Sequence, residues 1–354
     1  MTQSRKPRSA GTTTLAQVAE FDEVLDARSP AEFAEDHLPG ATSCPVLSDE
    51  ERAKVGTLYK QVSPFEARKV GAALILRNIG EHLETRFLDR DRSWRPLIYC
   101  WRGGKRSGAF THVLREIGWD ACALQGGYKT YRHMVVNELQ RLPATLHYRV
   151  LTGATGSGKS RVLHALAALG AQVLDLEALA AHKGSVLGPL PNAPQPSQKA
   201  FESALCARLQ AFGPDRPVFV EAESRKIGLV QLPDALLDGM RASPCTRIEA
   251  SLPARVEFLQ RDYDYFIADP ATLLQRIDRL HGLQSNALLA RWRELVEQAQ
   301  WPTLVEELLT RHYDPLYQRS QNGHYAQHSR AAVFATDDLS AEGVNALAQH
   351  ILAA

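Results

Sequence analysis

The segment Gly153–Ser160 restricts the fold of this chain more than any other feature. It reads GATGSGKS, so two glycines separated by four residues are followed directly by lysine and serine. The apolar stretch Tyr148–Leu151 precedes this segment, and the helix-compatible stretch Arg161–Leu169 follows it. A strand, a glycine-rich loop and a helix in this order predict a phosphate-binding loop in an α/β fold with a parallel sheet.

The residue types in this loop match the chemistry of phosphate binding. Glycines allow backbone N–H groups to surround phosphate oxygens, Lys159 places a positive charge beside the terminal phosphates, and the Ser160 hydroxyl can reach a Mg²⁺ ion. The predicted phosphate-binding residues are Gly153, Thr155, Gly156, Ser157, Gly158, Lys159 and Ser160. The motif alone does not distinguish nucleotide hydrolysis, kinase chemistry and binding of another diphosphate.

Acidic residues follow a second buried strand, Val218–Val220. A carboxylate at the carboxyl end of a strand beside the phosphate loop can bind Mg²⁺ directly or through water, so Glu221, Glu223 and Arg225 are candidates for Mg²⁺ or phosphate contacts. The alternative is a solvated charged turn. The segment Asp175–Glu177 ends another strand and is a weaker candidate.

Cys100 lies at the end of the apolar strand Pro96–Tyr99 and opens a basic, glycine-rich loop. Backbone N–H groups in such a loop can form an anion nest, and nearby cations favour a thiolate over a thiol. We therefore predict that Cys100 is catalytic; the loop residues that would bind an anion are Arg102, Gly103, Gly104, Lys105 and Arg106. The alternative is an inert buried cysteine.

A length of 354 residues suggests two domains. We predict a disordered tail over residues 1–13, a first domain over 14–140, and a phosphate-loop domain over 145–354 that has a helical C-terminal part. The proline-rich stretch Leu187–Gln198 predicts a loop, and the residues after Pro253 predict helices.

Charge and cysteine content exclude several classes of protein. With 41 Lys+Arg against 40 Asp+Glu, the chain is not a globally basic nucleic-acid binder, so contacts with nucleic acid would be local. The five cysteines show no metal-ligand spacing and favour a reducing compartment, so we expect a cytoplasmic protein. No apolar run is long enough to span a membrane, and the N-terminal residues do not resemble a signal peptide. The oligomeric state is open.

The first domain resembles rhodanese domains. The segments Asp26–Phe33 and His37–Ala41, the loop after Cys100 and Gly126–Tyr128 carry this resemblance. It implies that the loop cysteine carries a chalcogen. Asp26 and Arg28 are expected to brace the fold, and His37 is expected to be structural.

A rhodanese-like domain followed by a phosphate loop resembles the tRNA 2-selenouridine synthase family. Further segments resemble that family over most of the chain: Asp49–Gln61, Asp175–Ala180, His182–Ser185, Glu221–Gly228 and Tyr313–Tyr317. The resemblance implies replacement of sulfur by selenium at C2 of wobble 2-thiouridine, after S-geranylation of that sulfur.

The resemblance also implies substrates and partners. Selenophosphate and geranyl diphosphate would be substrates, with Mg²⁺ as a candidate ion and no tightly bound cofactor. Our mechanistic hypothesis is that the phosphate loop holds the diphosphate of geranyl diphosphate, and that Cys100 takes selenium from selenophosphate and presents it to C2. The partners would be the tRNA anticodon loop and a supplier of selenophosphate. Candidate tRNA phosphate contacts are Lys129, Arg132, Arg225, Lys226, Arg255 and Arg261; Tyr59 and Lys60 are candidates for the prenyl or base site.

Two other functions fit the same motifs. One is a sulfurtransferase fused to an ATP- or GTP-hydrolysing domain. The other is a binding module with an inactive rhodanese-like domain, in which Cys100 would be unreactive.

Overall fold

The computed structural model describes residues 11–185, 187–191, 193–317, 319, 325 and 327–354. The chain divides into two compact units, Met1–Asn137 and Glu138–Ala354. The division falls within helix α5 (Gly127–Arg141), a few residues before the predicted boundary at residues 142–144.

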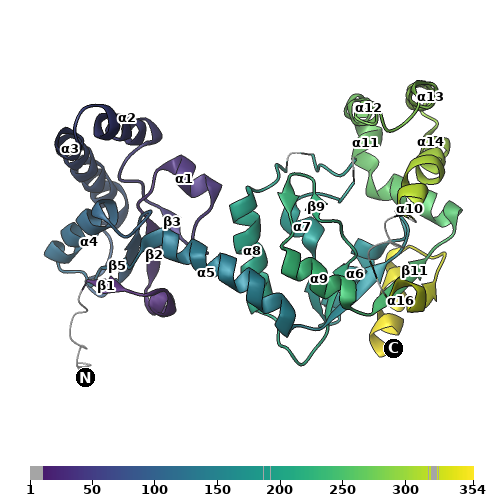
Figure 1. Cartoon of the computed structure of the whole chain (residues 1–354), viewed down its shortest axis with the longest axis horizontal. Coiled ribbons are helices and arrows are strands. Elements are labelled where there is room, and N and C mark those ends of the chain that lie inside the picture. The colour runs from purple at the N-terminus through teal and green to yellow at the C-terminus, as the bar shows by residue number, and fades with distance from the viewer. Residues whose placement is uncertain (1–10, 186, 192, 318, 320–324, 326) are drawn as a thin grey trace. The chain divides into compact units, whose positions relative to one another are not determined.

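The first unit contains a five-stranded parallel sheet with the order β1-β5-β4-β2-β3 (Figure 1). Its strands are β1 (Thr12–Thr13), β2 (Glu23–Asp26), β3 (Thr42–Ser43), β4 (Pro96–Tyr99) and β5 (Cys122–Leu124). Its helices are η1 (Leu15–Glu20), α1 (Pro30–Glu35), α2 (Asp49–Gln61), α3 (Pro64–His82), η2 (Leu83–Phe87), α4 (Lys105–Ile117) and α5.

The predicted disordered tail extends too far. Residues 1–10 lie outside the described residues, but Thr12 and Thr13 pair in parallel with Ala123 and Leu124 of β5. This pairing occupies backbone hydrogen-bonding groups of β5, so β1 belongs to the sheet.

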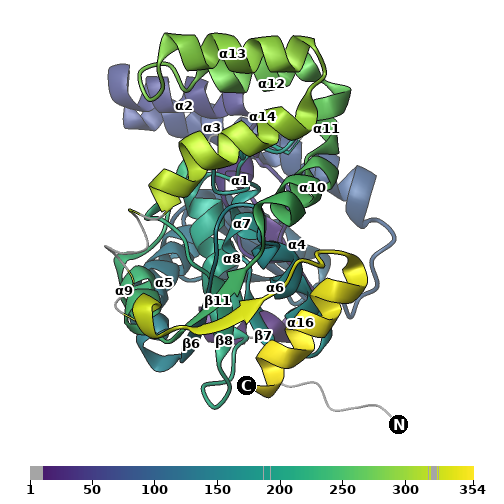
Figure 2. The same cartoon turned by 90° about the vertical axis from the view of Figure 1, so that its right-hand side faces the viewer.

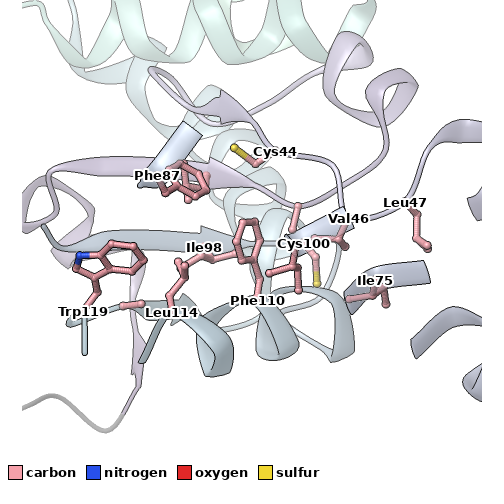
Figure 3. Packing of buried hydrophobic residues seen from close by; sticks show 14 of the residues in the cluster. Cys44, Val46, Leu47, Ile75, Phe87, Ile98, Cys100, Phe110, Leu114 and Trp119 are labelled. Atoms are coloured by element: carbon pink, nitrogen blue, oxygen red, sulfur yellow. The ribbon is translucent and has the colours of Figure 1, made fainter. Parts of the chain in front are cut away.

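The core of the first unit lies between the sheet and its helices. Figure 3 shows Ile98 and Cys100 packed with Phe110 and Leu114 of α4 in one buried cluster. Helices α2 and α3 follow each other closely but are separate, because Ser63 caps a new helix and Pro64 follows at its first position.

The second unit contains a parallel five-stranded sheet with the order β12-β11-β6-β8-β7. Its strands are β6 (Tyr148–Thr152), β7 (Gln172–Leu174), β8 (Val218–Glu221), β11 (Cys245–Glu249) and β12 (Ala332–Ala335); β9 (Lys226–Ile227) and β10 (Val230–Gln231) form a separate hairpin. The helices around this sheet are η3 (Leu142–Thr145), α6 (Lys159–Ala168), α7 (Leu176–Ala180), α8 (Gln198–Gln210), α9 (Asp234–Ala242), η5 (His328–Arg330) and α16 (Ala341–Ala353). Because β6 is central, the loop after it and the carboxyl end of β8 meet at one edge of the sheet.

A group of helices is inserted between β11 and β12. It consists of α10 (Leu252–Asp262), α11 (Asp264–Ala268), α12 (Pro270–Asp278), α13 (Asn286–Glu297), α14 (Trp301–Leu308) and η4 (Leu309–Tyr313). Figure 2 shows these helices gathered beyond one end of the sheet, while β12 lies beside β11. The predicted α/β class with a helical part is confirmed. The helical part is not the end of the domain, however. After the inserted helices the chain returns to the sheet, where β12 pairs with β11 and α16 packs on α6.

The described residues of the proline-rich stretch up to Ser197 form a loop, as predicted: α8 begins at Gln198, and Gln195 donates to the carbonyls of Ala180 and Ile227. Among the described residues, no helix combines the length and apolar character needed to cross a bilayer.

Candidate functional site

The loop after Cys100 is fixed by the turn that leads into α5. The backbone N–H groups of Tyr128 and Lys129 donate to the carbonyls of Cys100 and Trp101, at 2.8 and 2.9 Å. Gly103 has a φ of +62°, and a Cβ on it would lie 2.5 Å from the Leu124 carbonyl oxygen. Glycine is therefore required where this loop approaches β5.

The Cys100 sulfur accepts two hydrogen bonds from this loop. The donors are the Gly104 N–H at 3.3 Å and the Ser107 hydroxyl at 3.2 Å. Burial of the side chain opposes ionisation, but the Ser107 and Gly104 donors and the charge of Arg106 outweigh it, so the pKa of Cys100 is below its ordinary value. The loop thus stabilises a thiolate, the reactive form of cysteine.

The three basic residues of this loop differ in burial and in their partners. Arg106 lies in α4 and forms an ion pair with Glu32, at 2.7 Å. Glu32 also binds Arg52, and these bonds outweigh its burial and lower the pKa of Glu32 to about 2. Arg106 is therefore held in place by α1, whereas Lys105 and Arg102 are exposed.

A buried ion pair supports the sheet next to the cysteine loop. The Arg28 guanidinium binds both carboxylate oxygens of Asp26 and lies 4.0 Å from the centroid of the Tyr128 ring. The Tyr128 hydroxyl donates to Asp36 at 2.6 Å. Asp26 and Arg28 thus brace the fold, as predicted, and His37, which stacks on Phe33, is also structural.

The other four cysteines have no comparable loop. All five cysteines are free thiols, and all are buried. Burial raises the pKa of Cys44 to about 12, and it also raises that of Cys245. These two thiols are therefore poor nucleophiles at neutral pH.

The phosphate loop joins β6 to α6. Gly153, Gly156 and Gly158 all have positive φ angles, of 153°, 82° and 79°. The Lys159 ammonium donates to the Gly153 and Ala154 carbonyls, at 2.8 and 3.3 Å, so it lies across the loop. The Ser157 hydroxyl is buried, and no described group forms a hydrogen bond with it.

Residues far along the chain support this loop. Buried Arg255 donates to the Thr155 carbonyl at 2.8 Å and binds both carboxylate oxygens of Asp314. The Gly153 N–H donates to the Tyr317 hydroxyl at 2.5 Å. Arg255 is thus a brace of the phosphate loop, and the prediction that it contacts tRNA is wrong because its guanidinium is buried and paired. In the segment Tyr313–Tyr317, whose role the sequence left open, Tyr317 contacts the loop directly and Asp314 supports it through Arg255.

Three glutamates meet beside Lys159 and Ser160. One carboxylate oxygen of each of Glu177, Glu221 and Glu223 lies within 4.8 Å of the others. Burial and mutual repulsion raise the pKa of Glu177 to about 9 and that of Glu223 to about 8, and burial raises that of Glu221.

These glutamates fit a divalent cation. Oε1 of Glu221 is buried and no described group binds it, and the Ser160 hydroxyl lies 3.4 Å from Glu177. Oxygen ligands of this kind suit Mg²⁺. From the sequence alone we predicted Glu177 to be a weaker candidate than Glu221, because the sequence does not show that β7 and β8 are neighbouring strands.

Of the remaining predicted residues, Lys129 contacts the cysteine loop through its backbone N–H, which donates to the Trp101 carbonyl. Arg225 pairs with Asp234 at the start of α9, and Arg261 interacts with Glu257 on its own helix. Lys129, Lys226, Tyr59 and Lys60 are exposed.

Comparisons with known proteins agree with both units. Residues 12–134 match the family of rhodanese-like domains, and residues 146–269 match the tRNA 2-selenouridine synthase AAA domain. The chain is 38% identical to a tRNA 2-selenouridine synthase of Nitrosomonas europaea over 78% of this chain and 71% of that protein. It is 35% identical to one of Alcanivorax borkumensis, over 83% and 88% of the two chains. The protein therefore belongs to the tRNA 2-selenouridine synthase family.

Proposed function

We propose that this protein is a tRNA-modifying transferase that replaces the sulfur of wobble 2-thiouridine by selenium through an S-geranylated intermediate. The observation that carries the proposal is the combination, in one chain of this family, of a thiolate-stabilising cysteine loop with a complete phosphate loop. The wobble base lies in a single-stranded loop, so it can enter a pocket without disrupting a duplex.

The phosphate loop would serve the first step. The sulfur of 2-thiouridine attacks the allylic carbon of geranyl diphosphate, the C–O bond breaks, diphosphate leaves, and the N3 proton passes to solvent. Lys159 and the loop N–H groups would neutralise the charge that develops on the diphosphate. Glu177, Glu221, Glu223 and Ser160 would hold Mg²⁺, which would supply further positive charge there.

Geranylation prepares the base for substitution. A thiocarbonyl sulfur is a poor leaving group, whereas an S-alkylated sulfur departs as geranyl thiolate. Alkylation therefore makes C2 an electrophile with a usable leaving group.

Electron balance determines how Cys100 would take part in the second step. Selenium is fully reduced both in selenophosphate and in 2-selenouridine, so a selenium-bearing persulfide analogue on Cys100 would require an oxidant and then a reductant. A balanced route uses Cys100 as the nucleophile. Its thiolate attacks C2 and expels geranyl thiolate, the selenium of selenophosphate then attacks C2 and expels Cys100, and water cleaves the Se–P bond to release phosphate.

The test is mass spectrometry of nucleosides from tRNA that carries 2-thiouridine, after incubation with each substrate alone and with both. Geranyl diphosphate alone should give the S-geranylated nucleoside, and both substrates together should give 2-selenouridine. Hydrolysis of ATP or GTP with no change in the tRNA nucleosides would contradict the proposal and favour the sulfurtransferase fused to a hydrolase.

A further inference from the structure

An apolar pocket opens beside the phosphate loop. Thr155 of that loop is part of its wall, together with Leu259 of α10. Leu259 also faces the loop directly, because a Cβ on Gly156 would lie 2.8 Å from its Cδ1 atom. The phosphate loop therefore forms part of the wall of this pocket.

The pocket is built from the inserted helices. Its lining includes Phe266 of α11, Leu273 of α12 and Leu304 and Leu308 of α14, and all four belong to the hydrophobic core of this insertion. Because these side chains are fixed by core packing, the pocket is preformed. Its empty volume is about 610 Å³ when the space that opens to solvent is included.

The surface of the pocket is almost entirely apolar. Lys183 lies 3.9 Å from the centroid of the ring of Tyr263, a lining residue, and is held by Asp262 at 2.6 Å. A nucleobase in this pocket would leave most of its polar edge without partners, which is costly. A hydrocarbon chain needs no such partners.

We propose that this pocket binds the hydrocarbon chain of an allylic prenyl diphosphate whose diphosphate lies in the phosphate loop, and that its depth selects the chain length. This inference rests on the proposed role of the phosphate loop in prenyl transfer. The insertion between β11 and β12 then has a function: it adds a chain-binding compartment to a phosphate-binding sheet.

Val305 gives the sharpest test because it lines the pocket but is only half-buried, so the fold can accept a larger side chain there. Val305→Trp should reduce kcat/KM for geranyl diphosphate roughly tenfold or more relative to dimethylallyl diphosphate, and Val305→Ala should favour farnesyl diphosphate. Glu306→Trp is the matched control, because Glu306 is the exposed neighbour on the same helix. Inhibition by inorganic diphosphate should not change in any variant, since the head-group site is intact.

Binding measurements separate failure of this inference from failure of the proposed function. The probe is geranyl thiodiphosphate, which does not ionise readily, and its Kd is measured by calorimetry for each variant, with thermal denaturation to verify folding. Weaker binding by Val305→Trp, with unchanged binding of diphosphate, supports the pocket even if tRNA is not geranylated. An unchanged Kd, or an unchanged order of chain-length preference, would overturn the inference whether or not tRNA is geranylated.

Discussion

Polar groups around Cys100 outweigh the effect of burial on the pKa of its thiol. The Gly104 N–H and the Ser107 hydroxyl both donate to the sulfur. Cys44 belongs to the same hydrophobic cluster, but burial raises its pKa to about 12. Cys44 accepts a hydrogen bond from Arg86 at 3.2 Å, but this donor does not offset its burial, whereas the donors around Cys100 do.

The first prediction concerns this thiolate. The pH midpoint for alkylation of Cys100 by iodoacetamide, followed by peptide mass spectrometry, should lie below the reference value of about 8.5. Ser107→Ala should raise the midpoint by roughly one unit, because a hydrogen bond to the charged form is lost. Cys44 is the internal control and should not react near neutral pH. A wild-type midpoint at or above the reference value would contradict the prediction.

The second prediction concerns Glu32, which links Arg106 to Arg52. Its pKa falls from 4.5 to about 2 on folding, so its stabilisation is complete above pH 4.5 and is lost as the pH falls toward 2. Glu32→Gln should therefore lower the free energy of unfolding by roughly 1–3 kcal/mol at neutral pH, and by progressively less in acid.

Urea unfolding between pH 7 and pH 2.5 measures this difference. Glu66→Gln is the control, because Glu66 forms an exposed ion pair with Lys69 and should have little effect. A difference between wild type and Glu32→Gln that does not shrink in acid would show that the ion pairs are not its source.

The phosphate loop depends on a close approach of Gly156 to Leu259 of α10. Gly156→Ala would combine a positive φ with a Cβ only 2.8 Å from Leu259. We predict that this variant binds inorganic diphosphate at least about tenfold more weakly. Gly170→Ala is the matched control. Gly170 also has a positive φ, of +85°, but no heavy atom lies within 4 Å of the Cβ that the substitution adds.

Calorimetry with diphosphate compares the two alanine variants. Gly170→Ala should lose roughly 1–2 kcal/mol of stability from backbone strain and keep its affinity for diphosphate. Equal losses of affinity in both variants would mean that the loop does not form the diphosphate site.

The glutamate cluster gives the fourth prediction. Mg²⁺ should raise the Tm of the wild-type protein by a few degrees, because it binds the folded cluster. Glu221→Gln should lose this shift and should be more stable than wild type without Mg²⁺, since one buried repulsive carboxylate is removed. Differential scanning calorimetry tests both effects, with exposed Glu306→Gln as the control. A full Mg²⁺ shift in Glu221→Gln would exclude this cluster as the cation site.

The sequence predicted the elements whose signals are local. The phosphate loop, the cysteine loop and Glu221 at the end of β8 all follow from contiguous residues. It could not show that Arg255 and Asp314 form an ion pair, because 59 residues separate them. It also missed β1, whose two residues are extended because they pair with β5, and it ranked Glu177 too low because only the sheet brings β7 and β8 together.

At the scale of the whole molecule, each unit has its own parallel sheet and its own candidate site. The cysteine loop belongs to the first unit, and the phosphate loop, the glutamates and the apolar pocket belong to the second. We propose that the second unit catalyses prenyl transfer and that the first unit catalyses selenium transfer. Variants in the two units should therefore block different steps.

The most direct test supplies tRNA that already carries S-geranyl-2-thiouridine, with selenophosphate, and measures 2-selenouridine by nucleoside mass spectrometry. Lys159→Ala should convert this substrate as well as wild type does, although it geranylates 2-thiouridine poorly. Cys100→Ser should geranylate normally and form no 2-selenouridine. Full selenation by Cys100→Ser, or loss of selenation of the geranylated substrate in Lys159→Ala, would contradict the assignment of one step to each unit.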